Sequence, residues 1–162
     1  MNKRIILVGK AGSGKDFMRK KLEERNFKYA VSYTTRPARE HEVEGKDYFF
    51  ISEEKAQQMI ENGEFFEYVP FNGWIYGTTL SQWNQENDES VFIMTPTGLS
   101  HVGPHDRKEC FVIFVDIDKD VRKERLLNRN MPGDSLERRI EADELDFENF
   151  SNYDIRITNP DF

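Results

Sequence analysis

The sequence predicts an α/β domain with a parallel core sheet, into which a strand-rich lobe is inserted. Short apolar runs alternate with helical segments near the start of the chain and again after residue 90. The runs at 90–94 and 111–115 are typical of parallel strands that are buried on both faces. Between about residues 33 and 92 this alternation is replaced by closely spaced strands, which indicates an insertion.

Up to residue 51, the chain predicts one helix and several short strands. A strand followed by a helix and further strands is the pattern expected at the start of an α/β domain. The predicted ranges are a strand at 5–8, a helix at 13–25, and strands at 29–34 and 47–51.

Local capping and turn signals define the middle of the chain. Ser52 is suited to cap a helix because its hydroxyl can accept a backbone N–H, and Gly63 is suited to end that helix. The pair Asn72-Gly73 favours a tight hairpin turn. The predicted ranges are a helix at 52–62 and hairpin strands at 64–69 and 74–77.

The last part of the chain again alternates between strands and helices. Val121, Leu126 and Leu127 would form the inner side of one helix, which a Pro-Gly pair ends. The predicted ranges are strands at 90–94, 111–115 and 154–158, and helices at 118–130 and 135–150 with a break at 131–134.

Composition and charge limit the classes of function. A chain of 162 residues is expected to form one hydrophobic core, with room for a mobile subdomain. A net charge of −7 argues against a nucleic-acid partner, which would need a broad basic surface. The first apolar run is too short for a signal peptide or a membrane span. Because Cys110 is the single cysteine, we expect a structural thiol in a reducing compartment, and a cytoplasmic protein.

Residues 9–16 form a phosphate-binding motif. Gly9-x-x-x-x-Gly14-Lys15 follows the predicted strand at 5–8 and precedes a predicted helix. Glycines let backbone N–H groups turn around an anion, and the positive end of the helix points to the same place. Lys15 can then reach the β- and γ-phosphates of a nucleotide. The predicted nucleotide-binding residues are Gly9, Lys10, Ala11, Gly12, Ser13, Gly14, Lys15 and Asp16.

The alternative for this motif is a glycine-rich turn that binds nothing. The order of strand, loop and helix favours nucleotide binding instead. The motif normally ends in Ser or Thr, whose hydroxyl binds Mg²⁺, whereas this chain has Asp16. A carboxylate can also hold Mg²⁺, directly or through water, so Asp16 is a candidate metal ligand.

The inserted lobe carries motifs that occur in the same order in a known family. They are Thr-Thr-Arg-Pro-Ala-Arg at 34–39, Gly-Lys-Asp-Tyr at 45–48, Glu-Phe-Phe-Glu at 64–67 and Tyr-Gly-Thr at 76–78. With the phosphate-binding loop, they make nearly the whole chain resemble the guanylate kinase family. The resemblance implies a three-layer P-loop kinase fold, with a core at 1–32 and 90–162, a nucleoside-monophosphate-binding lobe at about 33–89 and a short helical lid at about 125–145.

The resemblance also implies a GMP site in this lobe. Guanidinium groups bind a monophosphate dianion well, and tyrosine and serine hydroxyls can donate to it. A carboxylate can accept from both N1–H and N2–H₂ of guanine, which makes Glu67 the expected base reader, with Thr78 beside it. Taken singly, each such side chain could instead be a surface or core residue. The implied GMP-binding residues are Ser32, Arg36, Arg39, Tyr48, Glu67, Tyr76 and Thr78.

A cluster of arginines follows the last long predicted strand. Arg122, Arg125 and Arg129 share one helical face, and a further pair at 138–139 follows the Pro-Gly break. In the family, a lid in this region brings arginines to the transferring phosphoryl group, whose charge they stabilise. The alternative is a solvated helix with surface ion pairs, which we favour for Arg122. The implied catalytic residues are Lys15, Arg125, Arg129 and Arg139.

Besides Asp16, the chain departs from the family pattern at two places. Thr95 and Thr97 stand where the family usually has acidic residues, so acidic support for the arginines or for Mg²⁺ is missing there. The lid segment between residues 130 and 139 is short, and the C-terminal segment is also short, which indicates a compact variant.

We therefore expect a nucleoside monophosphate kinase that converts ATP and GMP to ADP and GDP with Mg²⁺. An acceptor range that favours dGMP or includes other deoxynucleotides is an alternative, because no residue identifies the 2′ position. A second alternative is a non-catalytic guanylate-kinase-like binding module. Intact Lys15 and its glycines favour an enzyme, whereas Asp16, Thr95 and Thr97 argue mildly for the module. The expected partners are these small molecules, without nucleic acid or membrane.

Overall fold

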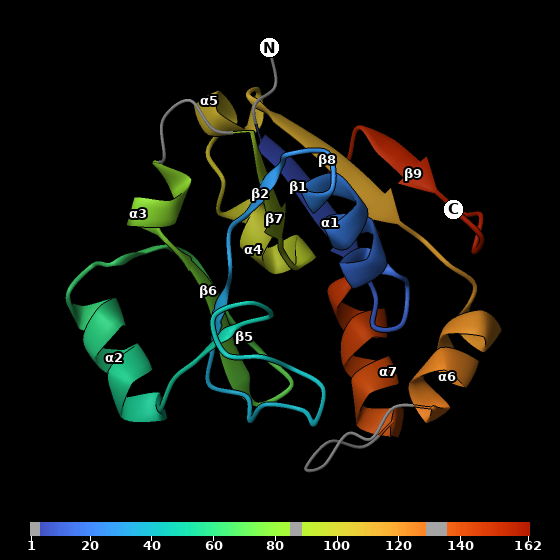
Figure 1. Cartoon of the computed structure of the whole chain (residues 1–162), viewed down its shortest axis with the longest axis horizontal. Coiled ribbons are helices and arrows are strands. Elements are labelled where there is room, and N and C mark those ends of the chain that lie inside the picture. Colours follow the sequence, from blue (N-terminus) through green and yellow to red (C-terminus); the bar gives the residue numbers. More distant parts are fainter. Residues whose placement is uncertain (1–3, 85–88, 129–135) are drawn as a thin grey trace.

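The protein is built on two separate sheets, which lie in different parts of the molecule (Figure 1). In the computed structural model, residues 4–84, 89–128 and 136–162 are described. One sheet is parallel and five-stranded, in the order β2-β7-β1-β8-β9, and the other is four-stranded, in the order β4-β3-β6-β5. The predicted α/β class, parallel core sheet and inserted strand-rich lobe are therefore confirmed.

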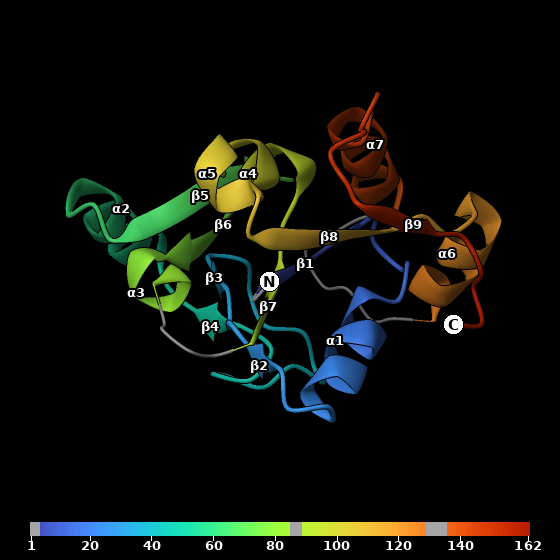
Figure 2. The same cartoon turned by 90° about the horizontal axis from the view of Figure 1, so that it is seen from above.

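The parallel core sheet carries helices on both faces (Figure 2). Leu7, Val91 and Val115 are buried on the face that Met18 and Leu22 of the first helix cover. Ile6 and Phe92 are buried on the other face. The strands are β1 (Arg4–Gly9), β2 (Lys28–Tyr29), β7 (Ser90–Ile93), β8 (Cys110–Val115) and β9 (Ile155–Ile157), and the flanking helices are α1 (Lys15–Glu23), α4 (Pro96–Ser100), α5 (Pro104–Arg107), α6 (Lys119–Leu127) and α7 (Leu136–Asp146).

The second sheet is organised around a tight hairpin. Asn72 and Gly73 have φ angles of 52° and 87°, as the predicted Asn-Gly turn requires. Ser52 accepts the Lys55 N–H, and Gly63 has a φ of 66°, so the predicted capping signals are confirmed. The elements are β3 (Tyr33–Thr34), β4 (Phe49–Phe50), α2 (Glu53–Glu61), β5 (Phe65–Phe71), β6 (Trp74–Thr79) and α3 (Leu80–Trp83).

The predicted single strand at 29–34 is wrong, because the chain changes sheets within this segment. Tyr29 pairs with Val91 in the core sheet, whereas Tyr33 pairs with Phe49 and Gly77 in the second sheet. Apolar periodicity cannot distinguish one strand from two short ones in different sheets. The crossing places Ser32 between the two sheets.

The predicted inner side of α6 is correct for Leu126 and wrong for Leu127. Leu126 is 2% exposed, whereas Leu127 is 66% exposed, since adjacent helical residues point about 100° apart. The end of the predicted helix and the predicted break at 131–134 lie partly outside the described residues. Cys110 is buried in β8, and burial raises the pKa of its thiol to about 11, as expected of a structural cysteine.

Across the described ranges, no helix has the length and apolar character needed to span a bilayer.

Candidate active site

The glycine-rich loop between β1 and α1 has the backbone geometry that its sequence predicts. Gly12 and Gly14 adopt φ angles of 78° and 97°, which side chains other than glycine rarely tolerate. A Cβ on Gly12 would also lie 2.9 Å from the Arg122 carbonyl oxygen, so space as well as conformation requires glycine there. The N-terminus of α1 begins at Lys15, directly after the loop.

Two arginines from α6 hold this loop by its carbonyl groups. Arg122 donates through Nε to the Ile117 carbonyl at 2.9 Å and through Nη1 to the Ala11 carbonyl at 3.5 Å. Arg125 donates to the Gly12 carbonyl at 3.0 Å. Our assignment of Arg122 to a solvated helix face is therefore wrong, because buried carbonyls need donors and this side chain supplies them.

A carboxylate from α7 holds the loop from the other side. Asp143 is buried, and its Oδ2 accepts the Ala11 N–H at 2.9 Å. The adjacent Glu144 lies 3.4 Å from the Lys10 ammonium group. Sequence analysis missed this contact, although Arg139, Asp143 and Asp146 are spaced to share one helical face.

Two cavities meet beside the loop. The one of about 60 Å³ is called the lobe cavity, and the one of about 130 Å³ is called the loop cavity. Lys15, Tyr48 and Arg139 line both, so these side chains lie where the cavities adjoin. Of the predicted site residues, the lobe cavity is lined by Gly9, Lys15, Ser32, Tyr48, Glu67, Tyr76 and Arg139, and the loop cavity by Ala11, Gly12, Ser13, Gly14, Lys15, Asp16, Arg39, Tyr48 and Arg139.

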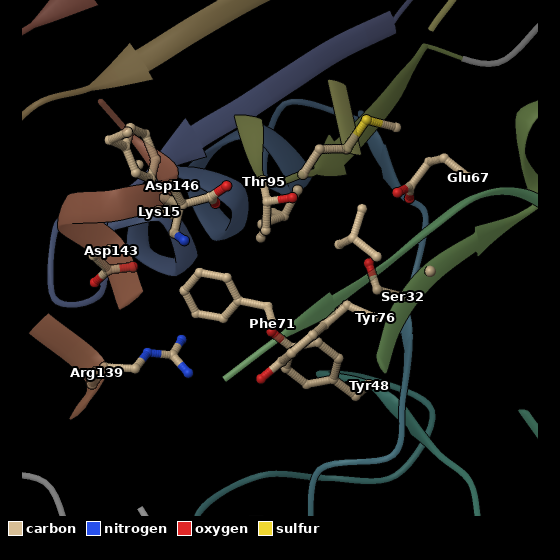
Figure 3. A pocket seen from close by; sticks show the side chains of 16 residues that line it. Lys15, Ser32, Tyr48, Glu67, Phe71, Tyr76, Thr95, Arg139, Asp143 and Asp146 are labelled. Atoms are coloured by element: carbon tan, nitrogen blue, oxygen red, sulfur yellow. The ribbon is translucent and has the colours of Figure 1, made fainter. Parts of the chain in front are cut away.

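Glu67 lies at the far end of the lobe cavity from Lys15 (Figure 3). It is 7% exposed and pairs in register with Thr78, next to an irregularity in the β5–β6 ladder that follows Phe65. Burial raises its pKa to about 7, against hydrogen bonds from Thr78 that favour the carboxylate. A Cβ on Gly98 would lie 2.7 Å from Glu67 Oε2, so α4 approaches this carboxylate through a glycine.

Arg36 is buried and held by a carboxylate that the sequence analysis missed. Its Nη1 and Nη2 donate to the two oxygens of Glu42 at 2.8 and 2.9 Å, and its guanidinium lies 5.1 Å from the Tyr48 ring centroid. Glu42 also accepts the Arg39 N–H at 2.8 Å. Burial alone would raise the pKa of Glu42, but these hydrogen bonds outweigh it and lower the pKa. The spacing of Arg36, Arg39 and Glu42, three residues apart, was the available signal.

Positive charge gathers where the cavities adjoin. Burial lowers the pKa of Arg39, and the nearby Arg36 and Arg139 guanidinium groups lower it further. Burial also opposes the charge of Arg139, but Tyr76 and Asp143 outweigh it and raise the pKa of Arg139. Such a cluster is chemically suited to anions that carry several charges, such as phosphate groups.

Asp146 of α7 supplies a carboxylate next to the two threonines that stand where acidic residues were expected. Thr97 donates to its Oδ1 at 2.8 Å, and its buried Oδ2 has no hydrogen-bond partner among the described residues. Figure 3 shows Asp146 beside Lys15 and Thr95. Burial raises the pKa of Asp146, Asp143 raises it further, and Lys15 opposes this shift. Positions 95 and 97 carry no acidic residue, as noted from the sequence. However, α7 places the carboxylates of Asp143 and Asp146 on the lobe cavity.

Two predicted residues, Asp16 and Arg125, have other surroundings than expected. Asp16 is exposed, with its carboxylate 3.5 Å from Arg19 Nη2, so its role as a metal ligand stays a prediction. Among the described residues, no group of three or more His, Cys, Asp or Glu is arranged to hold a metal ion. Arg125 contacts the loop and the Pro160 carbonyl, and Arg129 lies outside the described residues, so the catalytic roles of both stay predictions.

Comparison with known proteins agrees with this geometry. The family model described as guanylate kinase matches residues 1–162. The guanylate kinase of Enterococcus faecalis is 36% identical over 162 residues, covering 96% of this chain and 79% of that protein. The one of Lactococcus lactis is 34% identical over 161 residues, covering 96% and 78%. The crystal structure of guanylate kinase from Anaplasma phagocytophilum aligns with a TM-score of 0.74 and 25% identity, covering 98% of this chain and 77% of that one. The chain belongs to the guanylate kinase family.

Proposed function

We propose that this protein transfers the γ-phosphoryl group of ATP to GMP, giving ADP and GDP. The observation that carries the proposal is that Lys15 of α1 and Arg139 of α7 line both cavities where these adjoin, while the nearby Arg39 lines the loop cavity. The phosphate groups of two nucleotides, one in each cavity, would meet there and neutralise this positive charge. Membership of the guanylate kinase family supports the assignment of the two substrates.

The base of GMP would lie at the Glu67 end of the lobe cavity. The Glu67 carboxylate can accept from N1–H and N2–H₂ of guanine, whereas adenine offers no donor at N1. Thr78 holds this carboxylate by hydrogen bonds, which fixes its orientation before the base arrives. Burial of Glu67 makes the match stringent, because a base without donors would leave a buried carboxylate unpaired.

The phosphate of GMP would bind between the second sheet and the loop. Tyr48, Tyr76 and Ser32 line the lobe cavity and offer hydroxyl donors, while Arg39 supplies charge from the loop cavity. Arg36 would contribute positive charge from the far side of the Tyr48 ring, because Glu42 fixes its guanidinium against that ring. Two arginines and three hydroxyls are a chemically complete set for a monophosphate dianion.

The reaction needs positioning and electrostatic stabilisation rather than a covalent intermediate. A phosphate oxygen of GMP attacks the γ-phosphorus of ATP, and the bond from that phosphorus to the β–γ bridging oxygen breaks as ADP leaves. Lys15 and Arg139 lie where the charge of the transferring group would develop. Arg125 and Arg129, in the proposed lid, would add to this stabilisation when the lid closes.

The residues beside the loop are chemically suited to Mg²⁺. The buried Oδ2 of Asp146 has no hydrogen-bond partner among the described residues and lies beside Lys15. Asp16 offers a second carboxylate on the loop cavity. These two would hold Mg²⁺ together with the ATP phosphates, and the ion would neutralise charge on those phosphates.

The proposal is tested by measuring ADP release with ATP, Mg²⁺ and a panel of nucleoside and deoxynucleoside monophosphates. We expect GMP to give the highest kcat/KM. Equal or higher values for dGMP would assign the deoxynucleotide alternative. Binding of GMP without any turnover would assign the non-catalytic module, and a preference for AMP or dTMP would contradict the proposed role of Glu67.

A further inference from the structure

Arg19, in the middle of α1, holds three carboxylates from one buried position. Its side chain is 5% exposed. Glu23 lies 3.0 Å from Nη1, whereas Asp47 and Asp16 lie 3.2 and 3.5 Å from the same Nη2 atom. Its guanidinium also lies 4.5 Å from the ring centroid of Tyr29. The guanidinium is therefore fixed in place, and two carboxylates converge on the same nitrogen, Nη2, so their like charges lie close together.

The two carboxylates at Nη2, those of Asp16 and Asp47, belong to different parts of the proposed site. Asp16 directly follows Lys15 and lines the loop cavity. Asp47 directly precedes Tyr48, which lines both cavities. Asp47 is itself well fixed, because its Oδ2 accepts the Val43 N–H at 2.8 Å and its carbonyl accepts from the Tyr29 hydroxyl at 3.3 Å. Nη2 of Arg19 thus connects the phosphate-binding loop with the segment that carries Tyr48.

We propose that Arg19 is a positioning residue that couples nucleotide binding at the loop to GMP binding in the lobe cavity. This inference rests on the proposed function. A nucleotide that binds at the loop with its counter-cation draws the exposed Asp16 carboxylate toward the cation and away from Arg19. Nη2 then faces Asp47 alone, and this ion pair becomes stronger because the like charge of Asp16 no longer lies close to Asp47. The segment that carries Tyr48 is held more firmly to α1, which favours the arrangement that binds GMP.

The coupling must be reciprocal, since each ligand changes the affinity for the other by the same factor. The proposal predicts opposite effects on GMP affinity for substitutions at Asp16 and at Asp47. Removing the Asp16 carboxylate leaves Nη2 permanently to Asp47, so GMP should bind more tightly without the second nucleotide. Removing the Asp47 charge releases the segment that carries Tyr48 from Arg19, so GMP should bind more weakly. Both changes should abolish the coupling.

The test measures the Kd of GMP by titration calorimetry, with and without a non-hydrolysable ATP analogue and Mg²⁺. In the unmodified protein, we expect the analogue to tighten GMP binding by about three- to tenfold, a common size for coupling between sites. Asp16→Ser and Asp47→Asn should each bring this ratio close to one, with GMP affinity in the absence of the analogue raised in the first and lowered in the second. Glu23→Gln is the matched control, because it removes the 3.0 Å ion pair within α1 and should keep the ratio.

Thermal melting of all four proteins checks that each is folded before titration. The inference is overturned if the unmodified protein binds GMP equally well with and without the analogue, if Asp47→Asn keeps the ratio, or if Glu23→Gln loses it as fully as Asp47→Asn. The proposed function is overturned separately, and the inference with it, if the unmodified protein does not bind GMP at all.

Discussion

The phosphate-binding loop and the lobe cavity present charge to a ligand in different ways. In the loop, the backbone conformation of Gly12 and Gly14 is the main device, and side chains from α6 and α7 only hold its carbonyl and N–H groups. In the lobe, the devices are buried side-chain pairs, Arg36 with Glu42 and Glu67 with Thr78. The first region depends on local backbone conformation. The second depends on contacts between charged or polar side chains that lose their hydration when they are buried.

This difference predicts how each region responds to substitution. Changing a ligand-facing side chain of the loop removes charge from the reaction but leaves few buried groups unpaired. Changing Arg36 or Glu42 leaves the buried charge of the other residue behind, so stability as well as recognition should fall.

The sharpest test of the loop is Lys15→Met. We expect kcat to fall by roughly 10²-fold or more, or about 3 kcal/mol of transition-state stabilisation, with little change in Tm. Steady-state kinetics and thermal melting measure the two effects. Lys20→Met, on the exposed side of α1, is the matched control and should be near normal in both. Near-normal turnover of Lys15→Met would contradict the assignment of the loop.

Glu67→Gln tests base recognition in the lobe. The glutamine amide has only one acceptor oxygen, so one guanine donor would face its NH₂ group. The kcat/KM for GMP should therefore fall by a factor that corresponds to about 2–3 kcal/mol. The fall should be much smaller for the other nucleoside monophosphates. Glu64→Gln, which changes an exposed glutamate just before β5, is the control. An equal loss for every acceptor would show that Glu67 does not read the base.

Arg36→Ala should separate the two regions most clearly. We expect KM for GMP to rise by about tenfold or more while ATP affinity stays near normal, because the side chain lies in the lobe. Glu42 then keeps a half-buried charge without its bidentate partner, so stability should drop by about 3 kcal/mol. Binding titrations with each nucleotide and denaturant unfolding measure these effects. Loss of ATP binding instead would mean that the two cavities are assigned the wrong way round.

The pKa of Glu67 predicts a pH dependence that only the lobe should show. Its free-state pKa is about 7, and guanine needs the carboxylate form. GMP affinity should therefore rise by up to about tenfold per pH unit as the pH approaches 7 from below, and level off above it. The phosphate of GMP titrates at about pH 6, as in other phosphate monoesters, so Glu67→Gln supplies the baseline. Parallel curves for the two proteins would rule out the role of Glu67.

Asp16→Ser is expected to have the smallest effect on turnover. It restores the hydroxyl that the loop motif normally carries, so kcat should stay within about tenfold, or ~1.4 kcal/mol. ATP affinity should fall less steeply on Mg²⁺ removal than in the unmodified protein, because the nearby carboxylate no longer repels the phosphates. Equal Mg²⁺ dependence of the two proteins would mean that Asp16 acts only through its ion pair with Arg19.

Features that depend on neighbours in the chain could be predicted from the amino-acid sequence. The phosphate-binding loop, the Ser52 cap, the Asn72-Gly73 turn and the buried parallel strands each follow from conformational preferences or patterns within a few residues. The lobe motifs, taken in order, further led to Tyr48, Glu67 and Tyr76, which line the lobe cavity, and to Arg36, Arg39 and Thr78, which do not.

Contacts between distant segments could not be predicted, because they form only when the sheets and helices assemble. Ala11 and Asp143 meet across 132 residues, and Arg122 and Ala11 across 111, so no local pattern marks either pair. Arg122 looked like a solvated helical arginine because a sequence shows the charge of a side chain but not the carbonyls that it will reach. Asp146 was missed for the same reason. The burial of a charged group is decided by which partners the fold brings to it, and that is a property of the assembled sheets and helices.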